Sequence, residues 1–300
     1  MSQSEQSEAT AVLVNFDVQK KRQDLIKKIE DLPPLPASAQ QVLSIVASDP
    51  KDISRLEETI SHDMNLTSQL LKVANSAAYY PEAKINTVQR AIVYLGFSQV
   101  RNIALSLSMS SFLRLKKKNR LFDLEKFWIH SIATAMIARI LSFELDMEEP
   151  EVYFTAGLLH DIGRAAMNAC FQEEFNNAIR YAEEEELSLL AAERHFDMPH
   201  NMIGAWLVKN WKLPAIYVRA VATHHLSVKN KNTNKTGVLI GLADQISHNI
   251  GMGFMNPPRA NRYQLANYLG MSPDHIDEIE EQLGQIEEIA LAIADGFHID

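Results

Sequence analysis

The sequence has a single cysteine, Cys170, among its 300 residues. One thiol cannot form a disulfide within the chain, and it cannot supply the several thiolates of a structural zinc site. No apolar run approaches the ~18 residues that a membrane-spanning helix needs. Residues 1–10 are polar and acidic, without the basic and apolar parts of a signal peptide. We therefore expect a protein of the reducing cytoplasm that has no membrane partner.

Basic residues are also few. The chain has 29 lysines and arginines against 38 aspartates and glutamates, a net charge of −9 with neutral histidines. This balance argues against DNA or other bulk nucleic acid as a partner. The one dense basic run, residues 116–120, is interpreted as a solvated linker loop; nucleic-acid binding there is the less favoured alternative.

Patterns typical of β-strands are nearly missing, whereas apolar residues recur every three to four positions between residues 37 and 111. Gly96 is placed to end one of these helices. Residues 128–145 are apolar on nearly every side, which predicts a buried central helix, and Pro150 suits the first turn of the next one. Further helices are expected at residues 199–210, 214–225, 236–250 and 276–294. The predicted fold class is all-α.

Several of the ten histidines stand in apolar segments together with aspartates. His160 and Asp161, for example, are adjacent inside what reads as one apolar helix. Ionisable groups are costly to bury alone, so we expect these groups to meet one another. Helix bundles build metal sites by such convergence of imidazoles and carboxylates. The candidate ligands are His130, His160, Asp161, His200, His224, His225 and Asp244.

Each candidate also has a structural interpretation. His130 can be an ordinary core histidine, and Asp161 can pair with Arg164 three residues later. His224 and His225 can stabilise a helix C-terminus. Three basic residues could contact a phosphate group if the site binds one, but solvated surface charge is the simpler interpretation; they are Lys72, Arg164 and Lys209. The remaining histidines are interpreted as surface or structural groups; they are His62, His195, His248, His275 and His298.

In their order along the chain, His130, the Leu159-His160-Asp161-Ile162-Gly163 motif and Asp244 resemble the HD superfamily of metal-dependent phosphohydrolases. The N-terminal half is similar, more specifically, to the HDOD family, the HD-related output domain of bacterial signalling proteins. The resemblance covers about residues 27–250. Its further motifs include Leu32-Pro33-Pro34-Leu35-Pro36, Leu70-Leu71-Lys72-Val73-Ala74-Asn75-Ser76, Leu95-Gly96, Glu193 and Leu213-Pro214.

The resemblance implies an N-terminal helical bundle packed on an HD-like helical bundle. On this basis we divide the chain into a tail and lead-in helix (1–26), the N-terminal helical half (27–120), the HD-like half with the candidate metal site (121–250) and a C-terminal helical extension (251–300).

Many HDOD proteins lack a complete metal site, but this sequence retains the HD ligand positions. The resemblance therefore implies one or two ions of Fe, Mn or Zn. It departs from the two-metal HD-GYP enzymes, because no Gly-Tyr-Pro follows His225 and because Arg164 replaces a common lysine.

We expect a bacterial regulatory protein that acts through binding or conformational signalling, with a signalling protein or a nucleotide as its partner. The alternative is a phosphohydrolase acting on a nucleotide or phosphodiester, in which Asp161 and His160 would be catalytic.

Overall fold

The computed structural model describes residues 27, 32, 34–48, 52–113, 119–255 and 261–296, and all regular elements in these ranges are helices. The all-α prediction is therefore confirmed. The predicted tail and lead-in helix, most of the basic run at 116–120, and His298 lie outside the described residues.

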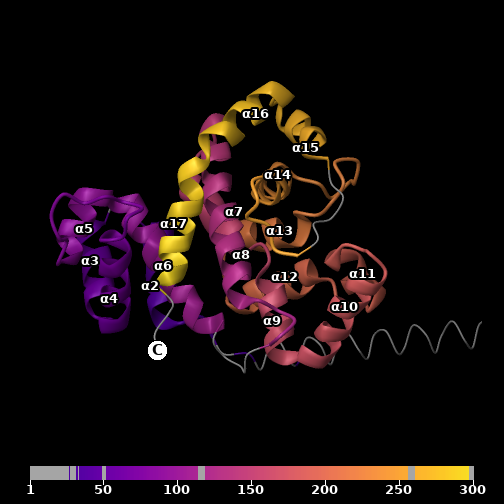
Figure 1. The fold of residues 1–300 in the computed structure, drawn as a ribbon, viewed down its shortest axis with the longest axis horizontal. Helices are drawn as coiled ribbons and strands as arrows, with labels where there is room; N and C mark the ends of the chain where they lie inside the picture. The colour runs from indigo at the N-terminus through magenta and orange to yellow at the C-terminus, as the bar shows by residue number, and fades with distance from the viewer. Residues whose placement is uncertain are drawn as a thin grey trace, which may run out of the picture.

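The N-terminal bundle consists of α2 (Ala37–Ser48), α3 (Ile53–Ser61), α4 (Met64–Ala74), α5 (Val88–Leu95) and α6 (Phe97–Leu113). Side-chain caps set several of its helix starts. Asp52, Asp63 and Thr87 accept hydrogen bonds from the first turns of α3, α4 and α5. Gly96 ends α5 as predicted, with a φ of 85° that disfavours other residues. Helices α2, α4 and α5 all pack on α6 (Figure 1).

The second half is built around α7 (Leu124–Glu144), which lies beside α8 (Pro150–Leu159) (Figure 1). The predicted buried central helix and the start of the next helix at Pro150 agree with these two elements. The chain continues through α9 (Ile162–Cys170), α10 (Gln172–Glu184), α11 (Leu189–His195), α12 (His200–Asn210), α13 (Ala215–Thr223) and α14 (Lys235–Asn249).

His160 and Asp161 do not lie inside one helix, and that expectation is wrong. Helix α8 ends at Leu159, α9 begins at Ile162, and the two residues form the junction. The break turns α9 onto α12, where a Cβ on Gly163 would lie 2.0 Å from the carbonyl oxygen of His200. Only glycine permits this approach, which holds the His160–Asp161 pair against the start of α12.

The C-terminal extension contains α15 (Arg262–Leu269), α16 (Pro273–Gln282) and α17 (Gly284–Asp295). The single helix expected at 276–294 is therefore wrong, because the chain breaks at Leu283. The break lets α17 run along α7 and reach the N-terminal bundle (Figure 1). There Lys72 Nζ donates to the carbonyl oxygen of Asp295 at 2.6 Å. No described helix is both long and apolar enough to span a bilayer.

An ionic cluster around the buried Arg101 ties the two halves together. Glu151, in the first turn of α8, lies 2.6 Å from Arg101 Nη2 of α6 and 2.8 Å from Arg139 Nε of α7. Asn102 Nδ2 donates to the same carboxylate at 2.8 Å. Burial opposes ionisation of Glu151, but the two arginines outweigh it and lower its pKa. The cluster therefore places the start of α8, the helix that leads to His160 and Asp161.

Candidate metal centre

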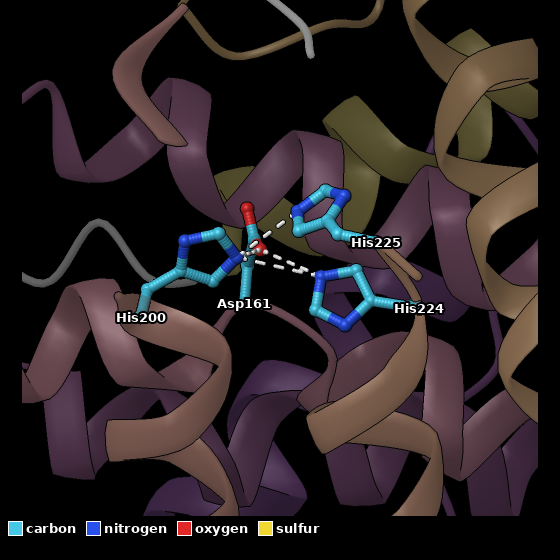
Figure 2. Close-up of side chains that lie close together, drawn as sticks. All are labelled: Asp161, His200, His224 and His225. Carbon is cyan, nitrogen blue, oxygen red and sulfur yellow. Dashed lines mark hydrogen bonds and ion pairs between the residues drawn. The ribbon is translucent and has the colours of Figure 1, made fainter. Parts of the chain in front are cut away.

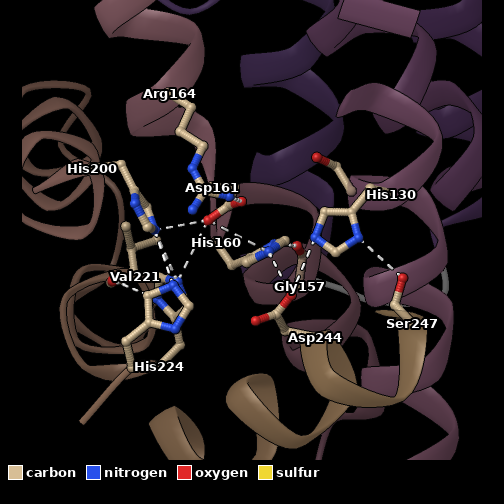
Figure 3. A network of polar contacts seen from close by, with 12 residues as sticks. His130, Gly157, His160, Asp161, Arg164, His200, Val221, His224, Asp244 and Ser247 are labelled. Carbon is tan, nitrogen blue, oxygen red and sulfur yellow. Dashed lines mark hydrogen bonds and ion pairs between the residues drawn. The ribbon is translucent and has the colours of Figure 1, made fainter. Parts of the chain in front are cut away.

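The seven predicted ligands gather in one region of the second half (Figure 2 and Figure 3). They come from α7, the α8–α9 junction, the start of α12, the residues after α13, and α14. Their ligand atoms form two groups, each within 4.8 Å; the first is Asp161, His200, His224 and His225, and the second is His130, His160 and Asp244. All are buried except the half-buried His225.

The first group is arranged around the carboxylate of Asp161 (Figure 2). Asp161 Oδ1 lies 2.9 Å from His200 Nε2 and 3.5 Å from His224 Nε2. His200 Nε2 lies 3.4 Å from His224 Nε2 and 3.1 Å from His225 Nε2. Three ring nitrogens and one carboxylate oxygen thus face the same point.

The second group adjoins the first through His160. His130 Nε2 lies 3.2 Å and His160 Nε2 lies 3.9 Å from Asp244 Oδ1. His160 Nε2 is also 3.6 Å from Asp161 Oδ1. Asp161 therefore lies between the two groups, where a carboxylate can serve both.

The opposite ring nitrogens show which tautomers are present. His160 Nδ1 lies 2.7 Å from the carbonyl oxygen of Gly157, and His224 Nδ1 lies 2.8 Å from that of Val221. A carbonyl only accepts, so Nδ1 donates and Nε2 keeps its lone pair. His130 Nδ1 likewise lies 3.1 Å from the carbonyl oxygen of Met252. This is how proteins orient metal-binding imidazoles.

The donor set fits a transition-metal ion. The buried Nε2 atom of His160 has no hydrogen-bond partner, and the carboxylate oxygens Asp161 Oδ1 and Asp244 Oδ1 lie 3.6 and 3.9 Å from it. An orphaned polar atom is costly in a protein interior, and a cation shared with the two carboxylates would satisfy it. Imidazole nitrogens with carboxylate oxygens suit Fe, Mn or Zn, so the buried clusters indicate a metal site.

The protonation states of His160, His225 and Asp161 suit metal binding, whereas burial of His200 is outweighed by Glu193 and Asp161, which raise its pKa in the metal-free protein. Burial lowers the pKa of His160 to about 3, so its ring is neutral at pH 7. Burial and the neighbouring imidazoles of His224 and His200 hold the pKa of His225 well below its usual range. Burial disfavours ionised Asp161, but Arg164 and the imidazoles outweigh it and hold its pKa well below the ordinary value. Neutral imidazoles and an ionised carboxylate are the forms that bind metals.

Arg164 and Glu193 support the centre from outside. Arg164 pairs with Asp161 Oδ2 and, at 3.0 Å, with Glu193 Oε1. The other oxygen of Glu193 pairs with His200 Nδ1 and accepts from the His200 backbone N–H at 3.0 Å. Arg164 is buried, so the expectation of a solvated surface charge is wrong; its local pairing with Asp161 is present. From the sequence, Glu193 was identified only as part of a family motif. Its role depends on contacts with Arg164 and His200, which sequence spacing does not show.

His248 was expected to be a surface or structural group, but its side chain is only 10% exposed and belongs to this region. Its Nε2 lies 3.5 Å from Asp244 Oδ1, and its ring centre is 4.9 Å from that of His130. His248 follows Asp244 by four residues on one helix, and this spacing predicts that the two side chains lie on the same helix face. By contrast, His195 stacks on Tyr181, and His275 is a surface partner of Glu144.

A pocket of about 320 Å³ reaches the first group. Its lining includes His224, His225, Arg194 and Gln245, and α15 contributes Leu265. A small molecule in this pocket would therefore lie against His224 and His225 at the edge of the centre, and part of the wall comes from the C-terminal extension.

Comparisons with known proteins agree with this architecture. A solved structure from Marinobacter aquaeolei VT8, provisionally named a signal transduction protein, is 21% identical with a TM-score of 0.77, covering 93% of this chain and 65% of that one. One from Shewanella amazonensis SB2B, provisionally named a phosphohydrolase, is 23% identical with a TM-score of 0.71, covering 90% and 97%. At these identities the similarity shows the fold alone.

Among curated relatives, Ribonuclease Y of Opitutus terrae is 30% identical over 164 residues, which cover 55% of this chain and 22% of that protein. The chain spans less than two-fifths of the length of the curated relatives it matches. The family model of the HDOD domain matches residues 32–227, a range that stops before Asp244. The chain therefore belongs to the HDOD domain family.

Proposed function

We propose that this chain is a bacterial signal-transduction protein whose HD-type centre holds one or two ions of Fe, Mn or Zn. The observation that carries the proposal is the convergence of seven buried or half-buried donors, among them the orphaned Nε2 atom of His160. Bound ions stabilise the folded state, so occupancy can act as a signal in its own right. A partner protein or a nucleotide would receive or supply that signal.

The chain's own residues would hold the ions in defined roles. Asp161 Oδ1 lies between the two donor groups and is the bridging candidate. Arg164 holds the other oxygen of Asp161, which leaves Oδ1 directed at the imidazoles. Glu193 fixes His200 through both its ring and its backbone N–H.

A second candidate function is metal-dependent hydrolysis of a phosphoester, favoured by the pocket that reaches His224 and His225. Bound ions would supply Lewis acidity and an acidified water there. Asp161 would hold the ions in position. The neutral ring of His160 would present its Nε2 lone pair to the same ions. A nucleotide or phosphodiester is the expected substrate class.

Metal analysis followed by a turnover assay tests both proposals. The protein is purified without chelator, its transition metals are quantified, and nitrophenyl phosphoesters and cyclic dinucleotides are offered with added Mn. We expect bound metal that Asp161→Ala loses and that the surface control Asp274→Ala keeps. Turnover that disappears only in Asp161→Ala supports the hydrolase, and bound metal without turnover supports the signalling proposal alone. Protein that takes up no metal contradicts both.

A further inference from the structure

A second cleft, of about 720 Å³, lies where the N-terminal bundle meets α7 and α8. None of the seven candidate ligands lines it. Its walls come from α3, the α5–α6 junction, α6, α7 and the first turn of α8. The volume is within the range of small-molecule sites, roughly 300–1,000 Å³.

Two helices direct their N-termini at this cleft. Phe97, Ser98 and Gln99, the first turn of α6, line it, and no described residue accepts a hydrogen bond from their backbone N–H groups. The first turn of α8 also lines it, but Pro150 has no N–H and the Val152 N–H donates to the carbonyl oxygen of Glu149, so α8 contributes its helix dipole and few free donors. Free N–H groups and the helix dipole make such ends favourable for anions.

A buried arginine provides independent evidence for an anion. The side chain of Arg101 lines the cleft although it is only 1% exposed. Its Nη2 contacts Glu151, but Nε and Nη1 make no hydrogen bond. Arg139 shares the same Glu151, so one half-buried carboxylate serves two guanidinium groups. Glu149, the other acid in the lining, is solvent-exposed and therefore screened.

The cleft also presents apolar surface to solvent. Phe143 is 52% exposed and Ile53 is 48% exposed, and both line it. The guanidinium of Arg139 lies 4.9 Å from the Phe143 ring centre, and that of Arg101 lies 5.6 Å from that of Phe97. Aromatic rings beside cationic groups suit a flat, anionic molecule.

We propose that this cleft binds a small organic anion, a phosphate or carboxylate group carried on a flat apolar body. The anionic group would accept from the first turn of α6 and from Arg101, and the body would cover Phe143 and Ile53. The cleft borders the start of α8, and His160 and Asp161 follow the end of α8. A ligand here would thus give a signalling protein an input site separate from its metal centre, whether or not that centre binds metal.

Calorimetric titration of chelator-treated protein tests the site without interference from bound metal. The probes are phenyl phosphate and benzoate, which separate the two anionic groups, with inorganic phosphate as the probe without an apolar body. We expect one of the aryl anions to bind at least tenfold more tightly than inorganic phosphate. Aryl anions that bind no more tightly than inorganic phosphate would overturn the proposal.

Ser98→Glu places a carboxylate at the start of α6, where it favours the helix but occupies the position of the anion. It should weaken aryl-anion binding at least tenfold. Gln172→Glu, which adds the same charge to the first turn of α10 outside the cleft, should change binding less than twofold. Phe143→Ala, a change at an exposed position, should weaken the aryl anion but not inorganic phosphate. Unchanged aryl-anion binding in both Ser98→Glu and Phe143→Ala would place the ligand elsewhere.

Discussion

Glu193 is a single buried carboxylate that positions two residues of the centre, His200 and Arg164. Such supporting contacts commonly change metal affinity by about 10- to 100-fold when they are removed. We predict that Glu193→Gln weakens Mn binding by about that factor, because the ring of His200 and the Arg164–Asp161 pair lose their fixed orientation. Calorimetric titration with Mn measures the change. The exposed control Glu183→Gln should bind as the wild type does, and equal affinity in all three proteins would contradict the assigned role.

His248 predicts a pH dependence for the metal-free protein. Burial, only partly offset by Asp244, lowers its pKa to about 4 from an ordinary 6.5. The unfolded chain therefore binds a proton at higher pH than the folded one, and stability falls as the pH drops from 6.5 towards 4. His248→Asn should reduce this slope by about 1 kcal/mol per pH unit between pH 6 and 5, as measured by urea unfolding. The same slope in both proteins would contradict the buried placement.

The sequence predicted the seven donors because each is an ionisable residue in an apolar segment or beside a helix end. It indicated the Arg164–Asp161 pair only as a structural alternative, and it did not predict that Glu193, Arg164 and His248 lie around the centre. Their partners come from other helices or depend on which helix face is buried, and charged residues at such spacing are usually solvated.

At the scale of elements, α9 and α12 approach closely enough that a side chain at Gly163 would meet the backbone of His200. Gly163→Ala should therefore destabilise the fold by at least about 2 kcal/mol and weaken metal binding, since His200 must move. Gly284→Ala is the matched control, because nothing lies within 4 Å of its added Cβ. It should be neutral or stabilising by up to about 1 kcal/mol. Similar unfolding midpoints for the two variants would show that the α9–α12 contact is looser than described.

The cluster at the start of α8 makes a second prediction at this scale. Glu151→Gln removes the negative charge between Arg101 and Arg139. Breaking a buried ion pair in this way costs about 3 kcal/mol, because an uncompensated cation stays buried. Denaturant unfolding should show this loss, whereas the exposed Glu173→Gln in α10 should stay within about 0.5 kcal/mol of the wild type. A loss as small as that of the control would mean that the cluster does not couple the halves.

Most helices were predictable because their apolar periodicity and end signals agree, as at Gly96 and Pro150. The break at Leu283 and the separate helix α15 were missed. In residues 276–294 the periodicity continues through the break, although Gly284, which begins α17 directly after Leu283, was an available signal. For α15 the signals were present, since Asn261 caps its start and Gly270 ends it with a φ of 87°.

For the whole molecule, the C-terminal extension lies across both halves. Helix α17 packs on α7 and reaches α4 and α6, and α15 packs on α14, which carries Asp244 (Figure 1). The arrangement of the two bundles was predicted from the family resemblance and not from apolar periodicity. Apolar periodicity indicates which face of a helix is buried, but not which other helix packs on that face.

Metal removal should lower the stability of the whole fold. Ligands at about 100 times their Kd stabilise a protein by about 2.7 kcal/mol, which corresponds to a change in Tm of about 4 °C for a chain of this size. We therefore predict that chelator lowers the Tm of metal-loaded protein by about this amount. Asp161→Ala should melt at the same temperature with and without chelator. A chelator effect of equal size in both proteins would show that the stabilising metal is bound elsewhere.

The most direct test of the central claim is anomalous scattering from a crystal grown with Mn. The account predicts an anomalous peak bounded by Asp161 Oδ1 and the surrounding imidazole nitrogens, with a second peak beside His130, His160 and Asp244 if two ions bind. A Mn-loaded crystal with no peak among these seven residues would contradict it.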